Sequence, residues 1–271
     1  MIQTAKRIAN VEEYYFSRKL AEVRGLDTPE LRVVNLGIGS PDQAPSSSTI
    51  DALVTSAKNP GNHGYQNYKG IPQLRKGIAE LYQRIYKVDL DSETMILPLM
   101  GSKEGIMHIS MAFVNEGDEV LIPNPGYPTY SSVANLVGAT LRPYALREDL
   151  NWGIDIDALR KSDLSKVKLM WINFPHMPTG RTASRDELKA LVDLARKHQF
   201  LIINDNPYSL ILNDEPVSIL SIEGADEVAL ELNSLSKSHN MAGWRIGWVA
   251  GRCLQIQAYE RERAVQSAGV G

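Results

Sequence analysis

Apolar and polar residues follow two alternating patterns over most of the chain. Residues 71–86 place apolar side chains three and four positions apart, which predicts a helix, and residues 94–101 form a short apolar run typical of a buried strand. The alternation continues to residue 251. It predicts helices over 71–86, 102–114, 127–138 and 184–199. It predicts strands over 94–101, 118–125, 140–146, 168–175, 200–207, 228–236 and 244–251.

Strands that alternate with helices of ordinary length predict an α/β fold, with a mostly parallel seven-stranded sheet and helices on both faces. Ahead of this region, residues 11–26 have helical spacing and predict an N-terminal arm or helix. Residues 33–42 predict a short strand that runs into a Gly/Pro turn. Sheets of this class bind ligands at the carboxyl ends of their strands, so the loops after the strands are the expected place for chemistry.

The composition narrows the class of protein without assigning an activity. The 271 residues are 43% hydrophobic, enough for a sizeable core, and the net charge of −3 gives no reason to expect nucleic acid or a membrane surface as partner. No apolar run resembles a signal peptide or spans a bilayer, and the single cysteine, Cys253, fits a reducing compartment. We therefore expect a cytoplasmic protein, and the five histidines lack the spacing of metal ligands.

Two loops at predicted strand ends carry residues suited to binding a ligand. The Gly101–Ser102–Lys103 turn enters a helix and suits a phosphate, although an ordinary helix N-terminus capped by Ser102 explains it as well. Asp205 ends an apolar strand and suits pairing with a protonated ring nitrogen. An Asx turn before Pro207 is the equally plain alternative.

A third loop, residues 234–248, reads SLSKSHNMAGWRIGW. A nucleophilic lysine must be neutral part of the time, and desolvation or a nearby cation lowers its pKa to allow this. Lys237 fits this need, and Arg245 offers a planar fork for a phosphate, unless both are merely exposed loop charges. Ser234 and Ser236 add hydroxyl donors. A phosphate, a ring nitrogen that needs a carboxylate and an aldehyde that needs a lysine together describe pyridoxal 5′-phosphate.

With these residues assigned, the sequence resembles the fold-type I pyridoxal-phosphate-dependent aminotransferases of the class I/II family. The resemblance covers nearly the whole chain and rests on motifs in the family's order, which are LGIGSPD, GYQNYKGIPQLR, GSKEG with PNPGYPTY, NFPHMPTG with NDNPY, and SLSKSHNMAGWRIGW. Their form is closest to the branch that contains LL-diaminopimelate and aspartate aminotransferases. The resemblance implies a transaminase that moves an amino group between an L-amino acid and a 2-oxo acid, with 2-oxoglutarate as the expected acceptor.

The resemblance also implies a role for each matching residue. Lys237 would hold the cofactor as a Schiff base and then move the proton, and Asp205 would pair with the pyridine nitrogen. Tyr208 would donate to the phenolic oxygen, and Tyr127 would stack on the ring. The residues expected to bind the phosphate are Ser102, Lys103, Ser234, Ser236 and Arg245.

Two further residues are expected to complete the site. Tyr65 would reach the cofactor phosphate of the neighbouring subunit, so that a homodimer shares its active sites. Gly39 would lie against the substrate carboxylate, where a side chain would intrude.

Two features depart from the family pattern. Met177 stands where the family has an asparagine, and a thioether cannot donate to the phenolic oxygen. Tyr208 would then act alone, or His176 or Asn173 would compensate. The chain ends at RERAVQSAGVG, within an expected long helix and ahead of the family's C-terminal segment with its carboxylate-binding arginine.

The expected domains follow from this end point. An N-terminal arm with part of the small domain would span residues 1–45, and the cofactor-binding large domain would span 46–271, with the C-terminal small-domain segment absent. Two other functions fit the same motifs, namely a carbon–sulfur lyase of the same fold and a cofactor-binding fragment with weak catalysis. A regulatory domain fused to a DNA-binding module is disfavoured, because no helix-turn-helix pattern precedes the fold and the charge is not basic.

Overall fold

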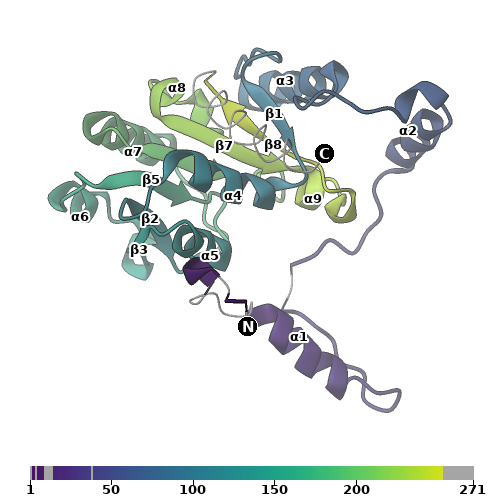
Figure 1. Cartoon of the computed structure of the whole chain (residues 1–271), viewed down its shortest axis with the longest axis horizontal. Coiled ribbons are helices and arrows are strands. Elements are labelled where there is room, and N and C mark those ends of the chain that lie inside the picture. Colours follow the sequence, from purple (N-terminus) through teal and green to yellow (C-terminus); the bar gives the residue numbers. More distant parts are fainter. Residues whose placement is uncertain (1, 4, 9–14, 38, 253–271) are drawn as a thin grey trace.

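The fold is built on a single sheet with helices on both faces (Figure 1). The computed structural model describes residues 2–3, 5–8, 15–37 and 39–252. The strands are β1 (Ile96–Leu99), β2 (Glu119–Asn124), β3 (Thr140–Arg147), β4 (Gly153–Ile154), β5 (Val167–Ile172), β6 (Leu201–Asp205), β7 (Ala229–Ser234) and β8 (Gly247–Gly251).

The α-helices are α1 (Tyr15–Leu26), α2 (Ser47–Ala57), α3 (Pro72–Tyr86), α4 (Ser102–Phe113), α5 (Pro128–Leu136), α6 (Ile156–Lys161), α7 (Arg185–His198), α8 (Ala225–Val228) and α9 (Leu235–Ser238). The short 3-10 helices are η1 (Lys6–Ile8), η2 (Pro60–Asn62), η3 (Glu148–Leu150), η4 (Ile219–Ser221) and η5 (Ala242–Trp244). Local sequence sets several of these ends. Ser184, for example, forms a capping box with Glu187 at the start of α7.

The sheet has the strand order β1-β8-β7-β6-β5-β2-β3-β4 in the described part of the chain. Strands β7, β6, β5, β2 and β3 run parallel to one another, whereas β8 is antiparallel to β1 and β7, and β4 is antiparallel to β3. The predicted α/β fold with a mostly parallel sheet is therefore confirmed. The predicted count of seven strands is wrong, because β4 adds an eighth that is only two residues long and too short to show a hydrophobic pattern.

Helices cover the two faces of the sheet through separate apolar clusters. Side chains of α4 and α5, such as Ile109 and Tyr130, pack with Trp171 and Leu230 on one face. Helices α6, α7 and α8 pack on the other face, and α3 covers the edge formed by β1 and β8. This arrangement places the carboxyl ends of β6 and β7 at one edge of the sheet, between the two helical layers (Figure 1).

The N-terminal region lies largely outside these clusters. Helix α1 falls within the predicted helix over 11–26, and no side chain of α2 is buried. The strand predicted over 33–42 is wrong, because the described residues of that segment form no strand. Val34 and Leu36 are exposed there, so the apolar pattern that predicted a buried strand has no core to pack against.

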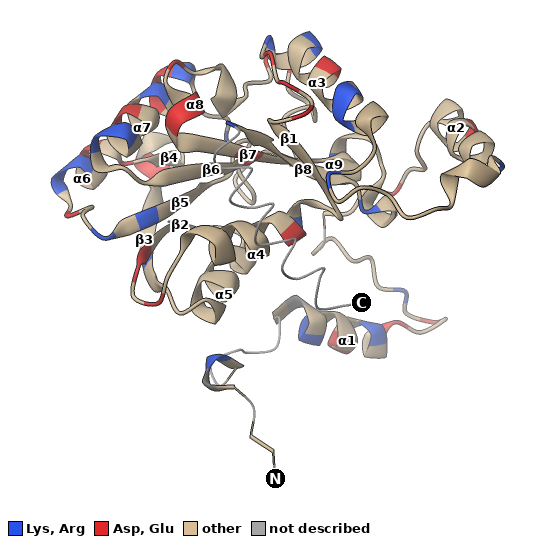
Figure 2. Cartoon of the chain, turned by 45° about the horizontal axis from the view of Figure 1, so that its top comes forward, with Lys and Arg blue, Asp and Glu red and all other residues tan. Residues whose placement is uncertain are grey.

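Surface charges on the helices are of mixed sign. Figure 2 shows basic and acidic residues side by side on α6, α7 and α8, where Lys189 pairs with Asp193 and Arg196 with Glu227. None of the described helices combines the length and the apolar character that a bilayer crossing requires. Cys253 and the predicted helix at the chain end lie outside the described residues.

Candidate functional site

The candidate site lies at the carboxyl end of β6, on the face of the sheet that α4 and α5 cover. Asp205 ends β6 in an almost fully buried position, and its Oδ2 accepts a hydrogen bond of 2.8 Å from the Tyr130 hydroxyl. Its Oδ1 is also buried and has no partner among the described residues. Burial raises the pKa of Asp205 to about 6, and the hydrogen bond from Tyr130 opposes that shift. An unpaired buried carboxylate oxygen suits a cationic donor.

Two aromatic residues that were not predicted from the sequence, Tyr130 and Trp171, stack on each other beside Asp205. The Tyr130 ring stacks on Trp171, with centroids 5.1 Å apart and planes inclined by 8°. Tyr127 meets Tyr130 edge-on at a centroid distance of 5.6 Å. Tyr127 directly precedes α5 and Tyr130 lies in its first turn, so the three-residue spacing was the signal that could have identified Tyr130.

Tyr208 lies three residues beyond the end of β6 and is partly buried. Burial, with the nearby Asp205 and Tyr127 side chains, raises the pKa of Tyr208 to about 12. The phenol therefore stays protonated at neutral pH and can donate a hydrogen bond to an oxyanion.

The turn between β1 and α4 lies directly against Arg245. Gly101 has a φ of 86°, a conformation that favours glycine, and a Cβ there would lie 2.2 Å from a guanidinium nitrogen of Arg245. The exposed Arg245 side chain donates to the Met100 carbonyl at 3.3 Å. The N-terminal end of α4, with its positive dipole end, and this guanidinium thus form a positively polarised cradle that suits an anion.

The β7–β8 ladder brings a serine to the same cradle. Ser234 pairs in register with Gly247, and a Cβ on Gly247 would lie 2.7 Å from the backbone nitrogen of Ser102. Ser234 is buried and its Oγ accepts the backbone N–H of Ser236 at 2.9 Å, which caps α9. Lys103 is exposed in the first turn of α4. The structure therefore brings Ser102, Ser234 and Arg245 together.

Lys237 lies in α9, and burial lowers its pKa from the ordinary lysine value. Its Nζ donates a hydrogen bond to the Gly39 carbonyl, and the Asn240 side chain donates to the Ala44 carbonyl at 3.4 Å. Residues 39–44 therefore run along the turn that carries the lysine. A Cβ on Gly39 would meet no atom within 4 Å, so the predicted crowding at this glycine stays a prediction.

Within the described chain, Tyr65 forms no hydrogen bond or ring contact with the other predicted residues. It is fully exposed in the loop ahead of α3. That loop is held by Arg75, a buried residue that donates to the Gly70 carbonyl at 2.6 Å and the Ser92 carbonyl at 2.8 Å. Its exposure fits the expectation that it acts on another protomer, which stays a prediction.

The loop around Met177 is held by contacts that engage both residues considered as substitutes for the family asparagine. The Asn173 amide donates to the Asp205 main-chain carbonyl at 2.5 Å, and its Oδ1 accepts the Met177 N–H at 2.8 Å. His176 is buried, with its Nδ1 2.9 Å from the Thr179 hydroxyl, and burial lowers its pKa to about 4. His176 Nε2 is buried and has no partner among the described residues, so His176 and Tyr208 both stay predicted donors to a phenolic oxygen.

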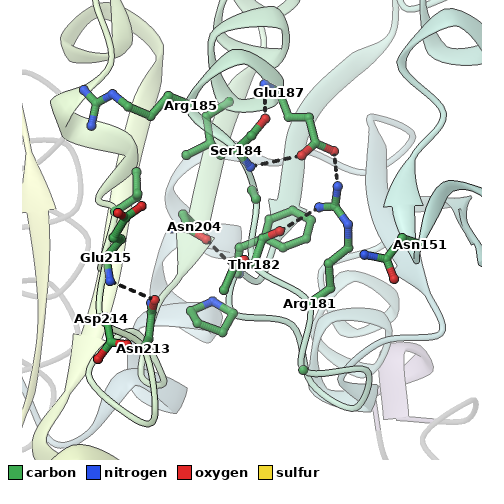
Figure 3. Close-up of a pocket in the computed structure, with 16 residues that line it drawn as sticks. Asn151, Arg181, Thr182, Ser184, Arg185, Glu187, Asn204, Asn213, Asp214 and Glu215 are labelled. Atoms are coloured by element: carbon green, nitrogen blue, oxygen red, sulfur yellow. Dashed lines mark hydrogen bonds and ion pairs between the residues drawn. The ribbon is translucent and has the colours of Figure 1, made fainter.

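A separate pocket of about 760 Å³ opens on the opposite face of the sheet, beside the start of α7 (Figure 3). Its wall holds Arg181, which pairs with Glu187 at 2.6 Å, and the side chain of Asn204 (Figure 3). None of the described residues that line it is one predicted to bind the cofactor. This pocket and the candidate site are thus different places.

Comparison with known proteins agrees with this geometry. Residues 32–268 match the model of a family described as aminotransferase class I and II. LL-diaminopimelate aminotransferases of Dehalococcoides mccartyi and Aquifex aeolicus are 39% and 40% identical over 99% and 100% of this chain. The matches cover 70% and 73% of those relatives, so the chain spans about 70% of their length. The predicted family is confirmed, and with it the prediction of a transaminase.

Solved structures give the same result for the fold. BacF from Bacillus subtilis, in its apo form, has a TM-score of 0.92 and 33% identity over 98% of this chain and 68% of its own. An aminotransferase from Staphylococcus aureus has a TM-score of 0.87 and 29% identity over 97% of this chain and 68% of its own.

Proposed function

The chain belongs to the aminotransferase class I and II family, and from this premise we propose that it is a pyridoxal-phosphate-dependent aminotransferase of L-amino acids and 2-oxo acids. The choice of cofactor rests on the buried carboxylate of Asp205. Its Oδ1 is buried without a partner among the described residues, at the strand ends that also carry Lys237. A protonated ring nitrogen would satisfy that oxygen.

The remaining residues fit the same cofactor. A phosphate suits the cradle of Ser102, Ser234 and Arg245, where glycine at position 101 lets the guanidinium approach the helix N-terminus. Tyr127 lies edge-on to Tyr130 beside Asp205, within reach of a planar ring. Lys103 and Ser236 belong to the same two turns and are proposed as secondary phosphate contacts.

Each side chain then has a defined task in transamination. The cofactor supplies an aldehyde for the substrate amine and an electron-withdrawing ring. The negative charge of Asp205 keeps the ring nitrogen protonated, and the Tyr208 hydroxyl donates to the phenolic oxygen. Lys237 would hold the cofactor through its aldehyde, and its amine would serve as the base and acid that moves a proton during the transfer. Its burial favours the neutral amine that both tasks require.

We further propose that the protein acts as a homodimer in which Tyr65 reaches the cofactor phosphate of the partner subunit. The support is the full exposure of Tyr65 and of further apolar side chains in the N-terminal part of the chain. These apolar residues are Leu31, Val34, Leu36, Leu53 and Tyr68. Gly39 is proposed to face the substrate carboxylate, and a cytoplasmic location remains the expectation from the sequence.

The relatives suggest which amino donor to test first. Those with 39–40% identity are named LL-diaminopimelate aminotransferases, so LL-diaminopimelate with 2-oxoglutarate is the proposed pair. Spectral conversion of the bound cofactor by the donor, reversed by the 2-oxo acid, would support transamination. Release of ammonia and a thiol from a sulfur amino acid would instead indicate the lyase.

The cofactor proposal is tested by reduction with borohydride in the presence of pyridoxal phosphate, followed by peptide mass spectrometry. A single reduced adduct on Lys237 is expected, because Lys237 follows the end of β7, next to the β6 end that carries Asp205, and burial lowers its pKa. Adducts scattered over surface lysines would contradict the proposal. An adduct on Lys237 without conversion by any amino donor would indicate a cofactor-binding fragment with weak catalysis.

Replacing Arg245 with glutamine is expected to weaken pyridoxal-phosphate binding about 10-fold to 100-fold, because a charge-assisted hydrogen bond contributes about 1.5–3 kcal/mol. Binding of pyridoxal, which lacks the phosphate, should change little. Both affinities are measured by absorbance titration of the cofactor-free protein. Arg185→Gln is the matched control, since Arg185 is also exposed and donates to a main-chain carbonyl. Equal losses for both ligands would contradict a phosphate contact.

Replacing Met177 with asparagine is expected to move the pH midpoint of the bound cofactor's visible absorbance to lower pH by about one unit. A donor to the phenolic oxygen stabilises its anionic form and lowers the proton affinity of the linked Lys237 nitrogen. Met177→Leu, which has a similar size and no donor, should keep the original midpoint. An unchanged midpoint in the asparagine variant, or an equal shift in the leucine variant, would rule out this role for position 177.

A further inference from the structure

A second polar layer lies on the opposite face of β6 and β7, under the cofactor anchors. Along each strand the side chains alternate, so the face opposite Asp205 and Ser234 receives the side chains of their neighbours. Those neighbours are buried and polar, and α3 covers them with two tyrosines. The layer consists of Tyr82, Tyr86, Asn204, Ser209, Glu231 and Asn233.

Within this layer the Tyr86 hydroxyl joins two segments. It lies 2.5 Å from the Ser209 hydroxyl and accepts a hydrogen bond of 3.3 Å from the Asn233 side-chain amide. The other end of that amide, Oδ1, accepts the backbone N–H of Ser234 at 2.8 Å. Ser209 in turn holds the loop after β6, because its carbonyl accepts the Asn213 side chain at 3.0 Å. Burial raises the pKa of Tyr86 to about 12, so its hydroxyl stays neutral and can keep both hydrogen bonds.

The Tyr86 hydroxyl contacts Ser209 and Asn233, and each of these two residues lies next to a proposed cofactor contact. Ser209 directly follows Tyr208, and Asn233 directly precedes Ser234 at the start of the turn that carries Lys237. We propose that Tyr86 is a positioning residue that fixes Tyr208 relative to the Ser234–Lys237 turn. The inference rests on the proposed function, since it concerns the placement of the phenolic-oxygen donor and the phosphate-binding turn.

Tyr82 provides an internal contrast on the same helix, one turn earlier. It is fully buried, like Tyr86, and its hydroxyl donates to Glu231 Oε1 at 2.9 Å. Glu231 lies in the middle of β7, and its other oxygen accepts the Ile219 N–H at 3.0 Å. Tyr82 therefore supports the packing of α3 on the sheet, whereas Tyr86 contacts the residues beside two anchors.

The test compares Tyr86→Phe with Tyr82→Phe. Each variant removes one buried hydroxyl from α3 and keeps the aromatic ring, so each should lower the melting temperature of the cofactor-free protein. Tyr86→Phe is expected to weaken pyridoxal-phosphate binding about fivefold to tenfold and to shift the pH midpoint of the bound cofactor's visible absorbance. Tyr82→Phe is expected to leave that midpoint unchanged and to alter the affinity less than about twofold.

Ser209→Ala removes the same hydrogen bond from its other partner and serves as the second variant if Tyr86→Phe does not fold. It should reproduce the loss of affinity, and the double variant with Tyr86→Phe should lose no more than either single variant, because both remove one interaction. Equal effects of Tyr82→Phe and Tyr86→Phe, or wild-type affinity and midpoint in Ser209→Ala, would overturn the positioning role of Tyr86 and leave the proposed function standing. Failure of the wild-type protein to form the Lys237 adduct would overturn the proposed function, and the inference with it.

Discussion

Replacing Lys237 with alanine is expected to abolish the borohydride-trapped adduct and to lower transamination turnover by about four orders of magnitude or more. The proposed function gives Lys237 two tasks, to bind the cofactor aldehyde and to move the proton between two carbons. Lys237 is partly buried, burial lowers its pKa, and it lies just past the end of β7. A water molecule cannot replace a positioned amine of suitable pKa in proton transfer.

Non-covalent binding of the cofactor should survive in Lys237→Ala, since Asp205 and the phosphate cradle are untouched. The measurement is turnover of an amino donor with 2-oxoglutarate, together with a binding titration of each variant. Lys161→Ala, at an exposed lysine near the end of α6, is the control and should match the wild type. A Lys237→Ala protein that keeps more than about one hundredth of the wild-type turnover would show that another group moves the proton.

The sequence was sufficient to predict the sheet and most of its strands, for a physical reason. Strands buried on both faces appear as short continuous apolar runs. Each of the seven strands predicted after residue 90 overlaps an observed strand. The apolar pattern over 33–42 failed because apolar residues there are exposed rather than packed in the core. Strand β4 was not predicted, because it has only two residues, which pair with the end of β3 and are too few to show a periodic pattern.

The sequence could predict those site residues that lie at the end of a strand or just after it. Asp205 and Ser234 end their strands, and Lys237 follows within one helical turn, so their proximity follows from the topology. The supporting residues were not predictable in this way. Tyr86 and Ser209 are 123 positions apart, and Tyr130 and Asp205 are 75 apart, so only the folded chain brings each pair together.

The structure places the Arg245 side chain on the surface, where it donates to the main-chain carbonyls of Ala242 and Met100. An exposed guanidinium beside a helix N-terminus can still bind an anion, but at a lower desolvation cost than a buried one. The specificity of this cradle therefore depends on the close approach that Gly101 permits.

Replacing Asp205 with asparagine is expected to lower turnover about 10²-fold to 10⁴-fold, the range that corresponds to breaking a buried charge pair worth about 3–5 kcal/mol. The amide keeps an acceptor for the Tyr130 hydroxyl but removes the negative charge that holds the ring nitrogen protonated. Turnover and the cofactor's absorption spectrum are the readouts. Glu231→Gln is the matched control, because Glu231 is also a fully buried carboxyl with a raised pKa but lies on the opposite face of the sheet.

The same substitution has a second, pH-dependent effect on the cofactor-free protein. The pKa of Asp205 is about 6 in the fold and 3.8 ordinarily, so between these values the folded state binds more protons than the unfolded state. Stability therefore falls as pH rises from about 4 to 7, by about 3 kcal/mol for this one group, and the loss is complete above the folded pKa. Asp205→Asn removes this titration, so its stability relative to wild type should rise over the same interval.

Urea unfolding of both cofactor-free proteins at pH 4 and pH 7 measures the difference directly. A difference that does not change with pH would mean that Asp205 is not held in a low-dielectric site, and the argument for its unpaired oxygen would fail. The expected result has a consequence for the bound state as well. A carboxylate that destabilises the empty fold regains that free energy when a cation pairs with it, so Asp205 would couple cofactor binding to the stability of the protein.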